Sequence, residues 1–192
     1  MTSPTDKKEF RKQMLAKRRA LDSEKINELS QGIAERLFAA KEYREARIML
    51  CFVSTEIEVN TRPIIKKALA DGKRVAVPLC IKGSCELSFR YITGTNDLAE
   101  GAFGILEPLS HCEECTGFDG ALCVVPSLCC DRRGHRMGYG RGYYDRFLAG
   151  FGGTSCGVIF GEFLLDRIPT EPTDMPLDMM ITESDTYRSI TP

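Results

Sequence analysis

The chain has 192 residues, 43% hydrophobic and 28% charged, which is typical of one soluble globular domain, and no run of about eighteen apolar residues could span a membrane. The net charge is −1, although residues 1–20 alone carry +5, from seven Lys or Arg and two Asp or Glu. A basic segment can bind nucleic acid, but the near-neutral total favours a basic helix that provides cations to a smaller anion.

The N-terminal segment is predicted to be helical. Charged residues fill positions 6–9, where a signal peptide needs an apolar core, so we expect a cytoplasmic protein. Apolar residues then recur at helical spacing from Phe10 to Leu21. Asp22 or Ser23 is expected to cap a second helix. We assign residues 1–45 to these helices and residues 46–192 to an α/β core, both within a single domain spanning 1–192.

The core is predicted to contain a largely parallel sheet. Continuous apolar runs of strand length are typical of strands that are buried on both faces of such a sheet. A helix capped by Thr61 and stopped by Gly72 separates the first two of these runs, which gives a right-handed strand–helix–strand unit. The four predicted buried strands are RIMLCFVS (47–54), RVAVPLC (74–80), ALCVVPSL (121–128) and TSCGVIFG (154–161).

The remaining segments carry weaker signals. In CELSFRYI (85–92), apolar and polar residues alternate, which predicts a half-exposed edge strand. Residues 93–119 have no periodic pattern and are expected to be mostly irregular. A helix is predicted over 143–149 and a short strand over 179–182, which completes a three-layer α/β domain.

Nine cysteines raise the question of disulfides or zinc. The number is odd, and several lie inside the apolar runs, where free cysteine packs as a small hydrophobe. The only CxxC lies in HCEEC (111–115) and has no second pair at zinc-ribbon spacing. We interpret this segment as a polar surface loop, with a zinc site as the less favoured alternative.

The segment DRRGHRMGYGRGYYDRFL (131–148) is the strongest candidate for a binding site. It follows the carboxyl end of a predicted strand, and open α/β sheets bind their ligands beyond the carboxyl ends of the strands. It then leads into a helix. Alternating glycines allow the backbone to approach an anion, and Arg136 and Arg141 can each bind phosphate oxygens. The spacing fits neither GxxxxGK followed by Ser or Thr nor GxGxxG. Phosphate binding is our interpretation, with a flexible arginine-rich surface loop as the alternative.

Carboxylates near this loop have two interpretations each. Asp145 suits Mg²⁺ beside a phosphate, but the helix dipole alone also favours an acid in a first helical turn. A second metal ligand is Asp174 or Asp178, unless both are turn residues. Glu56 and Glu58 follow the first strand and could accept hydrogen bonds from a ring with amide and amino groups, or could be solvated.

Taken together, these segments resemble the 5-formyltetrahydrofolate cyclo-ligase family, whose signature is similar to R-(L/M)-G-x-G-x-G-Y-Y-D. RMGYGRGYYD (136–145) fits it throughout. Supporting resemblances are KKEFRKQMLAKRRAL (7–21), VSTEIEVNT (53–61) and IPTEPTDMPLDMMITE (168–183). The resemblance covers nearly the whole chain and implies a Rossmann-like fold with a basic N-terminal helical extension. It also implies ATP- and Mg²⁺-dependent cyclisation of 5-formyltetrahydrofolate to 5,10-methenyltetrahydrofolate, with ADP and phosphate released.

The resemblance also implies roles for particular residues. Arg141 and Tyr144 would be catalytic, Asp145 and Asp174 would bind Mg²⁺, and the substrate would contact Val53, Glu56, Tyr139 and Tyr143. Glu58 remains an alternative to Glu56, and Asp178 to Asp174. The residues implied to bind ATP are Lys7, Lys8, Arg11, Arg136, Gly138, Gly140, Arg141, Gly142, Tyr143 and Tyr144.

The partners implied by the resemblance are ATP and a folate that carries one or more glutamates, and we expect a monomer that binds neither nucleic acid nor membranes. A regulatory module that binds a phosphate or nucleotide without turnover is the alternative function. An RNA-binding protein is the least favoured one, because the chain lacks Trp and its body is net acidic.

Overall fold

The structure, a computed structural model, describes residues 4–81, 83–101 and 104–189, so both ends of the expected 1–192 domain lie outside the described residues. Its centre is a seven-stranded sheet with the strand order β12-β11-β9-β6-β1-β2-β3. The inner strands are parallel, and the two edge strands pair antiparallel with their neighbours. The strands are β1 (Ile48–Cys51), β2 (Arg74–Cys80), β3 (Leu87–Ile92), β6 (Leu122–Val125), β9 (Thr154–Val158), β11 (Met179–Ile181) and β12 (Thr186–Arg188).

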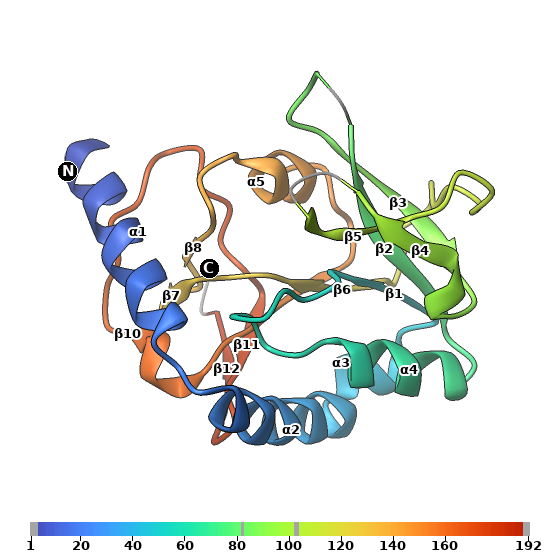
Figure 1. Ribbon diagram of the computed structural model, residues 1–192, viewed down its shortest axis with the longest axis horizontal. Helices are drawn as coiled ribbons and strands as arrows, with labels where there is room; N and C mark the ends of the chain where they lie inside the picture. The colour runs from blue at the N-terminus through green and yellow to red at the C-terminus, as the bar shows by residue number, and fades with distance from the viewer. Residues whose placement is uncertain (1–3, 82, 102–103, 190–192) are drawn as a thin grey trace.

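This sheet confirms the predicted α/β fold. Figure 1 shows three helices on one face, α2 (Ser23–Ala39), α3 (Lys41–Glu45) and α4 (Arg62–Ala70), and α5 (Tyr143–Leu148) on the other. The four predicted buried strands are present, and the strand predicted from alternation lies at the sheet edge as β3. No described helix is long and apolar enough to span a bilayer.

Helix boundaries follow the predicted signals with one exception. The Asp22 side chain accepts a hydrogen bond from the Glu24 amide and so caps α2. Gly72 ends the turn after α4 with φ +77°, a conformation that glycine adopts without a Cβ penalty. The exception is Thr61, which is the N-cap residue of α4 as predicted but makes no capping hydrogen bond with its side chain, because its hydroxyl donates to the Phe52 carbonyl oxygen at 2.7 Å.

Short strands occur in several segments where the sequence predicted none, among them β12 at the sheet edge. Residues 93–119 include the antiparallel pair β4 (Leu98–Glu100) and β5 (Leu106–Pro108). The strand β6 does not lead directly into the glycine loop (138–142), because the hairpin of β7 (Cys129–Asp131) and β8 (Arg136–Met137) intervenes. The strand β10 (Leu164–Leu165) pairs with β7. Strands of two or three residues are too short to produce a recognisable alternation of apolar and polar residues.

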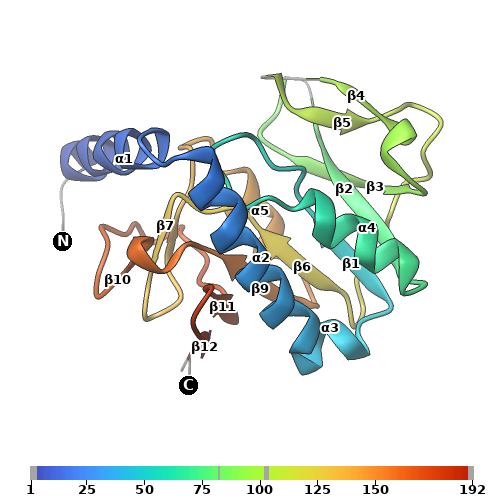
Figure 2. The ribbon, with the colours of Figure 1, turned by 60° about the horizontal axis from the view of Figure 1, so that its bottom comes forward.

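The helix α1 (Pro4–Arg19) is fastened to the sheet through Arg18. Its guanidinium lies between the rings of Phe160 and Phe163, at 4.5 and 4.4 Å from their centroids. The same group donates hydrogen bonds to the carbonyl oxygens of Leu128 and Ser127, which follow β6. The helix α1 begins at one end of the molecule (Figure 2). Its other end is held in place by the side chain of Arg18, a cation that is only 1% exposed.

The β7–β8 hairpin is closed around the buried carboxylate of Asp131. Burial raises the pKa of this carboxyl, but hydrogen bonds from the Arg133 side chain, the Arg133 amide and the Ile168 amide outweigh it, so the net pKa is lowered. A lowered pKa means that the ionised group stabilises the fold above the ordinary carboxyl range, and that this stabilisation is lost as the pH falls through the folded-state pKa.

We therefore expect Asp131→Asn to lower the free energy of unfolding at pH 7 by about 2 kcal/mol, since it removes the charge from several hydrogen bonds. Chemical denaturation at pH 7 and at progressively lower pH measures this. The gap between the two proteins should narrow as the pH falls below the ordinary Asp pKa of about 3.9. Asp166→Asn is the control, because that side chain is 95% exposed. A gap that did not change with pH would contradict the role of the Asp131 charge.

Candidate active site

A cavity of about 430 Å³ lies at the carboxyl ends of three neighbouring strands. Phe52 and Val53 follow β1, Cys80 ends β2, and Pro126 follows β6. This is the edge at which open α/β sheets bind their ligands. The cavity is within the range of small-molecule sites and is closed on other sides by α1, the glycine loop and the segment around Asp174.

Most of the predicted site residues line this one cavity. Lys8 and Glu56 do not, and both are exposed. The predicted residues that line it are Lys7, Arg11, Val53, Arg136, Gly138, Tyr139, Gly140, Arg141, Gly142, Tyr143, Tyr144, Asp145 and Asp174.

Two cations of α1 reach the cavity from one side of the helix. Lys7 and Arg11 are four residues apart and therefore lie on the same face. Lys7 Nζ contacts both oxygens of Asp174 at 2.7 Å, and Arg11 Nε donates to the Gly138 carbonyl oxygen at 2.9 Å. Lys8 is one position along and is turned by about 100°. The geometry of the helix therefore leaves Lys8 outside the cavity lining, unlike the other predicted ATP ligands.

The acid that enters the cavity from the β1–α4 loop is Glu58. Its Oε2 accepts hydrogen bonds from the Thr55 amide and hydroxyl, both at 2.8 Å, and its Oε1 accepts one from the Tyr139 hydroxyl at 3.0 Å. Glu58 is 7% exposed and lines the cavity, whereas Glu56 lies on the outside of the same turn. Of the two acids that the sequence left open, Glu58 is therefore the one that lines the cavity, because these hydrogen bonds hold its side chain inward.

Tyr139 spans the opening between the glycine loop and Glu58. It is 47% exposed, while its hydroxyl bonds to Glu58 across the cavity. Burial raises the pKa of Tyr139, and the Glu58 charge raises it further, so the phenol stays neutral and its hydroxyl donates the hydrogen bond to Glu58. The exposed part of the ring therefore faces the opening through which a planar ligand would enter.

A set of hydrogen bonds joins the glycine loop to the segment around Asp174. Arg136 Nη2 donates to Asp145 Oδ1 at 2.9 Å, and Nη1 donates to the Met175 carbonyl oxygen at 2.8 Å. The Met175 amide donates to the same Asp145 oxygen at 3.2 Å. Asp178 was the alternative to Asp174, but it accepts hydrogen bonds from the Ser155 amide and hydroxyl and does not line the cavity.

The three glycines of the loop serve different purposes. Gly140 and Gly142 have φ of +95° and +70°, which residues with a Cβ rarely adopt. A Cβ on Gly140 would also lie 3.2 Å from the Arg11 guanidinium. A Cβ on Gly138 would meet nothing within 4 Å and its φ is not positive, so the protein itself does not require glycine there. The open space leaves room for a ligand to approach the backbone at this position.

The two tyrosines after the loop differ in their surroundings. Burial raises the pKa of Tyr144 well above its ordinary value, so its hydroxyl is neutral. This hydroxyl is buried and has no hydrogen-bond partner among the described residues, which is an arrangement that a bound ligand can satisfy. Burial also raises the pKa of Tyr143, with the Cys80 thiol as the next contribution.

Apart from Glu58, the remaining wall residues belong to no motif that is recognisable in the sequence. Ile105 and Glu107 come from the segment that was expected to be irregular, and they approach the cavity because Glu107 Oε1 accepts a hydrogen bond from the Cys80 amide at 3.2 Å. The unpredicted wall residues are Phe52, Thr55, Glu58, Pro78, Cys80, Leu87, Ile105, Glu107 and Pro126, of which only Glu58 had been considered.

The cavity lining therefore combines two chemical characters. One part of the lining suits a polyphosphate with a hard metal ion. It consists of the glycine backbone, four cations and two carboxylates, namely Lys7, Arg11, Arg136, Arg141, Asp145 and Asp174. The apolar residues around Glu58 suit a flat ring with a hydrogen-bonding edge. A site of this kind can bring a phosphoryl donor and an organic acceptor together.

Comparison with known proteins agrees with this composition. The model of the 5-formyltetrahydrofolate cyclo-ligase family matches residues 3–183. The chain is 30% identical to the 5-formyltetrahydrofolate cyclo-ligase of Mycolicibacterium smegmatis, over 94% of this chain and 95% of that protein. It is 28% identical to a probable 5-formyltetrahydrofolate cyclo-ligase of Caenorhabditis elegans, over 93% and 92% of the two chains.

A solved structure is similar over nearly the whole chain. The solution structure of 5,10-methenyltetrahydrofolate synthetase from Aquifex aeolicus superimposes with a TM-score of 0.84 and 29% sequence identity, over 97% of this chain and 94% of that one. The protein belongs to the 5-formyltetrahydrofolate cyclo-ligase family.

Proposed function

We propose that this enzyme uses ATP and Mg²⁺ to convert 5-formyltetrahydrofolate into 5,10-methenyltetrahydrofolate. The observation that carries the proposal is that the glycine loop, with its cations, and the inward-facing Glu58 line one cavity. ATP would lie along the glycine loop with its phosphates toward Lys7 and Arg11. The pterin ring would lie against Val53, with its amide and amino groups donating hydrogen bonds to Glu58.

In the proposed reaction, the formyl oxygen attacks the γ-phosphorus of ATP, and the bond from that phosphorus to ADP breaks. N10 of the folate then forms a bond to the formyl carbon. The phosphorylated oxygen leaves as inorganic phosphate, and the N10 proton is lost. Phosphorylation is needed because an amide-like oxygen is a poor leaving group. The protein mainly positions the reactants and stabilises charge, and it needs no nucleophilic side chain.

Arg141 and Tyr144 are the side chains we place closest to the transferring group. Arg141 lies in the glycine loop on the exposed side of the cavity, where its guanidinium can neutralise charge that develops on the phosphoryl oxygens. Tyr144 holds its proton at neutral pH, so its buried hydroxyl is available to donate a hydrogen bond to the substrate. Arg136 positions Asp145 through the hydrogen bond between them.

The carboxylates of Asp145 and Asp174 fit Mg²⁺ by their chemistry, since both are oxygen donors that line the same cavity as the phosphate-binding backbone. Both are already paired with cations, Asp145 with Arg136 and Asp174 with Lys7. The ammonium group of Lys7 is therefore placed to contact both Asp174 and a phosphate of ATP. When bound, Mg²⁺ supplies charge neutralisation for the phosphate oxygens.

We expect Asp145→Asn to raise the Mg²⁺ concentration needed for half-maximal activity by about tenfold or more, because a neutral amide is a weaker ligand for a hard cation. Activity titrated against Mg²⁺ measures this, and thermal unfolding checks that the variant is folded, since Arg136 loses its counterion. Asp178→Asn, which alters a carboxylate outside the cavity, is the control. An unchanged Mg²⁺ dependence would leave Asp145 as a partner of Arg136 only.

The direct test of the function is the rise of methenyltetrahydrofolate absorbance when the protein is mixed with 5-formyltetrahydrofolate, ATP and Mg²⁺. We expect the signal to require all three. Binding of ATP without any rise would overturn the proposal and favour the regulatory module. We further infer a monomer that works in the cytoplasm on folates with one or more glutamates, and the nine free thiols support a reducing compartment.

A further inference from the structure

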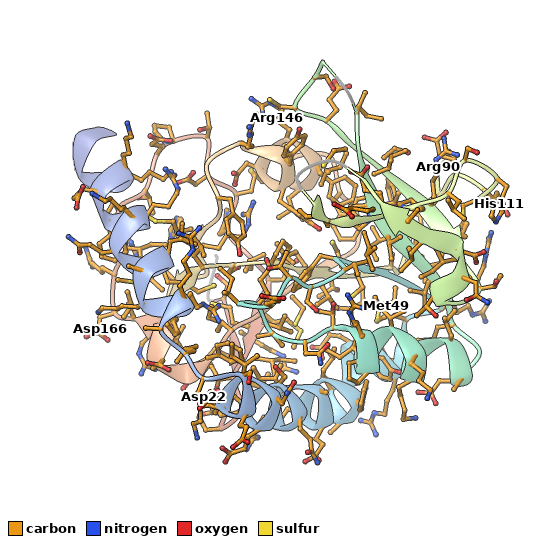
Figure 3. The ribbon with its side chains drawn as sticks, viewed as in Figure 1. Asp22, Met49, Arg90, His111, Arg146 and Asp166 are labelled. Atoms are coloured by element: carbon orange, nitrogen blue, oxygen red, sulfur yellow. The ribbon has the colours of Figure 1, made fainter. Side chains whose placement is uncertain are left out.

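A second cluster of potential metal ligands lies away from the active site. Asp97 ends the 3₁₀ helix η1 (Thr95–Asp97), and His111 and Cys112 lie in the turn that follows β5. One ligand atom from each of the three lies within 4.8 Å of the others. Figure 3 shows His111 at the edge of the molecule opposite α1, beyond Arg90 of β3.

Backbone hydrogen bonds hold the two contributing segments together. The Leu109 amide donates to the Asp97 carbonyl oxygen at 2.8 Å, and the Cys112 amide donates to the Leu109 carbonyl oxygen at 3.0 Å. Arg90 Nη1 donates to the carbonyl oxygens of Ser110 and Cys112, each at 3.1 Å. The positions of the ligand-bearing residues are therefore fixed by the fold and not by the side chains alone.

The Asp97 carboxylate is oriented by a second set of contacts. Its Oδ2 accepts hydrogen bonds from the Thr93 amide at 2.6 Å and from the Thr93 hydroxyl at 2.8 Å. Its other oxygen, Oδ1, lies 3.2 Å from His111 Nε2. Metal-binding carboxylates are commonly held in this way, with one oxygen bonded to the protein and the other facing the ion.

We propose that Asp97, His111 and Cys112 bind a divalent cation of the zinc class. A carboxylate oxygen, an imidazole nitrogen and a thiolate sulfur are the three donors that Zn²⁺ accepts in proteins. With metal–ligand bonds of about 2.0–2.3 Å, tetrahedral ligands lie about 3.3–3.7 Å apart. The distance between Asp97 Oδ1 and His111 Nε2 is 3.2 Å, close to this value. The Cys112 sulfur lies within 4.8 Å of both atoms, so side-chain movements of about 1 Å would bring it to the distance of a tetrahedral ligand.

The exposure of the three side chains provides a route for the ion. Cys112 is 6% exposed, whereas the side chain of Asp97 is 16% and that of His111 is 64% exposed. The ion would reach the thiol from the His111 side, and water would complete its coordination. A thiolate does not suit Mg²⁺, which prefers oxygen ligands, so this site and the proposed Mg²⁺ site select different ions.

The ligand set differs from the zinc alternative considered for HCEEC. The polar residues of this segment, His111, Glu113 and Glu114, are exposed as the interpretation of a polar surface loop predicts, but both cysteines are buried. Cys115 is directed elsewhere, with its Sγ 3.7 Å from the Gly117 carbonyl oxygen. A bound ion would instead cross-link η1 to the turn after β5. Because Ile105 and Glu107 beside this turn line the active-site cavity, the ion would stiffen that wall.

Cobalt and zinc titrations of the full, reduced, chelator-treated chain test the proposal. We expect one equivalent of Co²⁺ to give the near-ultraviolet band of a thiolate–cobalt bond, and Zn²⁺ to displace it. Zn²⁺ at about 100 times its dissociation constant should raise the melting temperature by about 5 °C. Mg²⁺ should neither give this band nor displace the bound Co²⁺.

Variants identify the ligands. His111→Ala should remove the cobalt band, Cys115→Ser should retain it, and Thr93→Val should weaken Co²⁺ binding by about tenfold through loss of the hydroxyl on Asp97. The proposal is overturned if the unaltered protein gives no band, if His111→Ala retains it, or if Cys115→Ser abolishes it. Formation of methenyltetrahydrofolate is measured separately with Mg²⁺ as the only metal, so failure there concerns the proposed function alone.

Discussion

Replacement of Arg141 by Ala is expected to lower kcat by about 100- to 1,000-fold while the affinity for 5-formyltetrahydrofolate stays within about threefold of the original. Removing one group that stabilises developing charge has an effect of this size in enzymes. The folate affinity should hold, because the proposed pterin contacts involve Val53 and Glu58 on the other side of the cavity. Steady-state kinetics and folate binding without ATP, measured by titration calorimetry, give the two quantities.

The matched control for this prediction is Arg132→Ala. Arg132 lies in the β7–β8 hairpin, pairs with Asp166 at 3.5 Å and does not line the cavity. We expect its kcat to remain within about twofold, and Arg141→Lys to recover only part of the lost activity, since Lys offers a point charge in place of a planar fork. Equal losses of turnover and folate affinity in Arg141→Ala would argue against a role in phosphoryl transfer.

Replacement of Glu58 by Gln is expected to weaken 5-formyltetrahydrofolate binding by about 10- to 100-fold. Hydrogen bonds to a charged acceptor are worth about 1.5–3 kcal/mol, and the amide presents donors toward groups of the pterin that are themselves donors. The change should appear in the KM for the folate and in its dissociation constant. The KM for ATP should change by less than about threefold.

Glu56→Gln provides a close control for the same loop. It makes the same chemical change two residues away, at an exposed position outside the cavity, and should leave both KM values unaltered. If the two variants behaved oppositely, with Glu56→Gln impaired and Glu58→Gln normal, the assignment from the structure would be wrong. The pair therefore tests the choice between the two acids directly.

The sequence by itself determined where the buried strands of the sheet lie and where most of the glycine loop lies. Strands such as Arg74–Cys80 are recognisable because burial on both faces demands an unbroken apolar run. Gly140 and Gly142 are recognisable because their backbone conformations exclude most other residues. These requirements act within a few neighbouring residues, so they leave a local pattern that can be read without knowledge of the fold.

Only the tertiary structure decided which of two similar acids enters the cavity and which distant segments close it. Glu58 is selected over Glu56 by hydrogen bonds from Thr55 and Tyr139, and the second of these comes from 81 residues away. Asp174 is selected over Asp178 by Lys7, which is 167 residues distant. Contacts across such separations depend on how the elements pack together, and short strands such as β5 are likewise stabilised by their partners, so neither leaves a periodic signal in the chain.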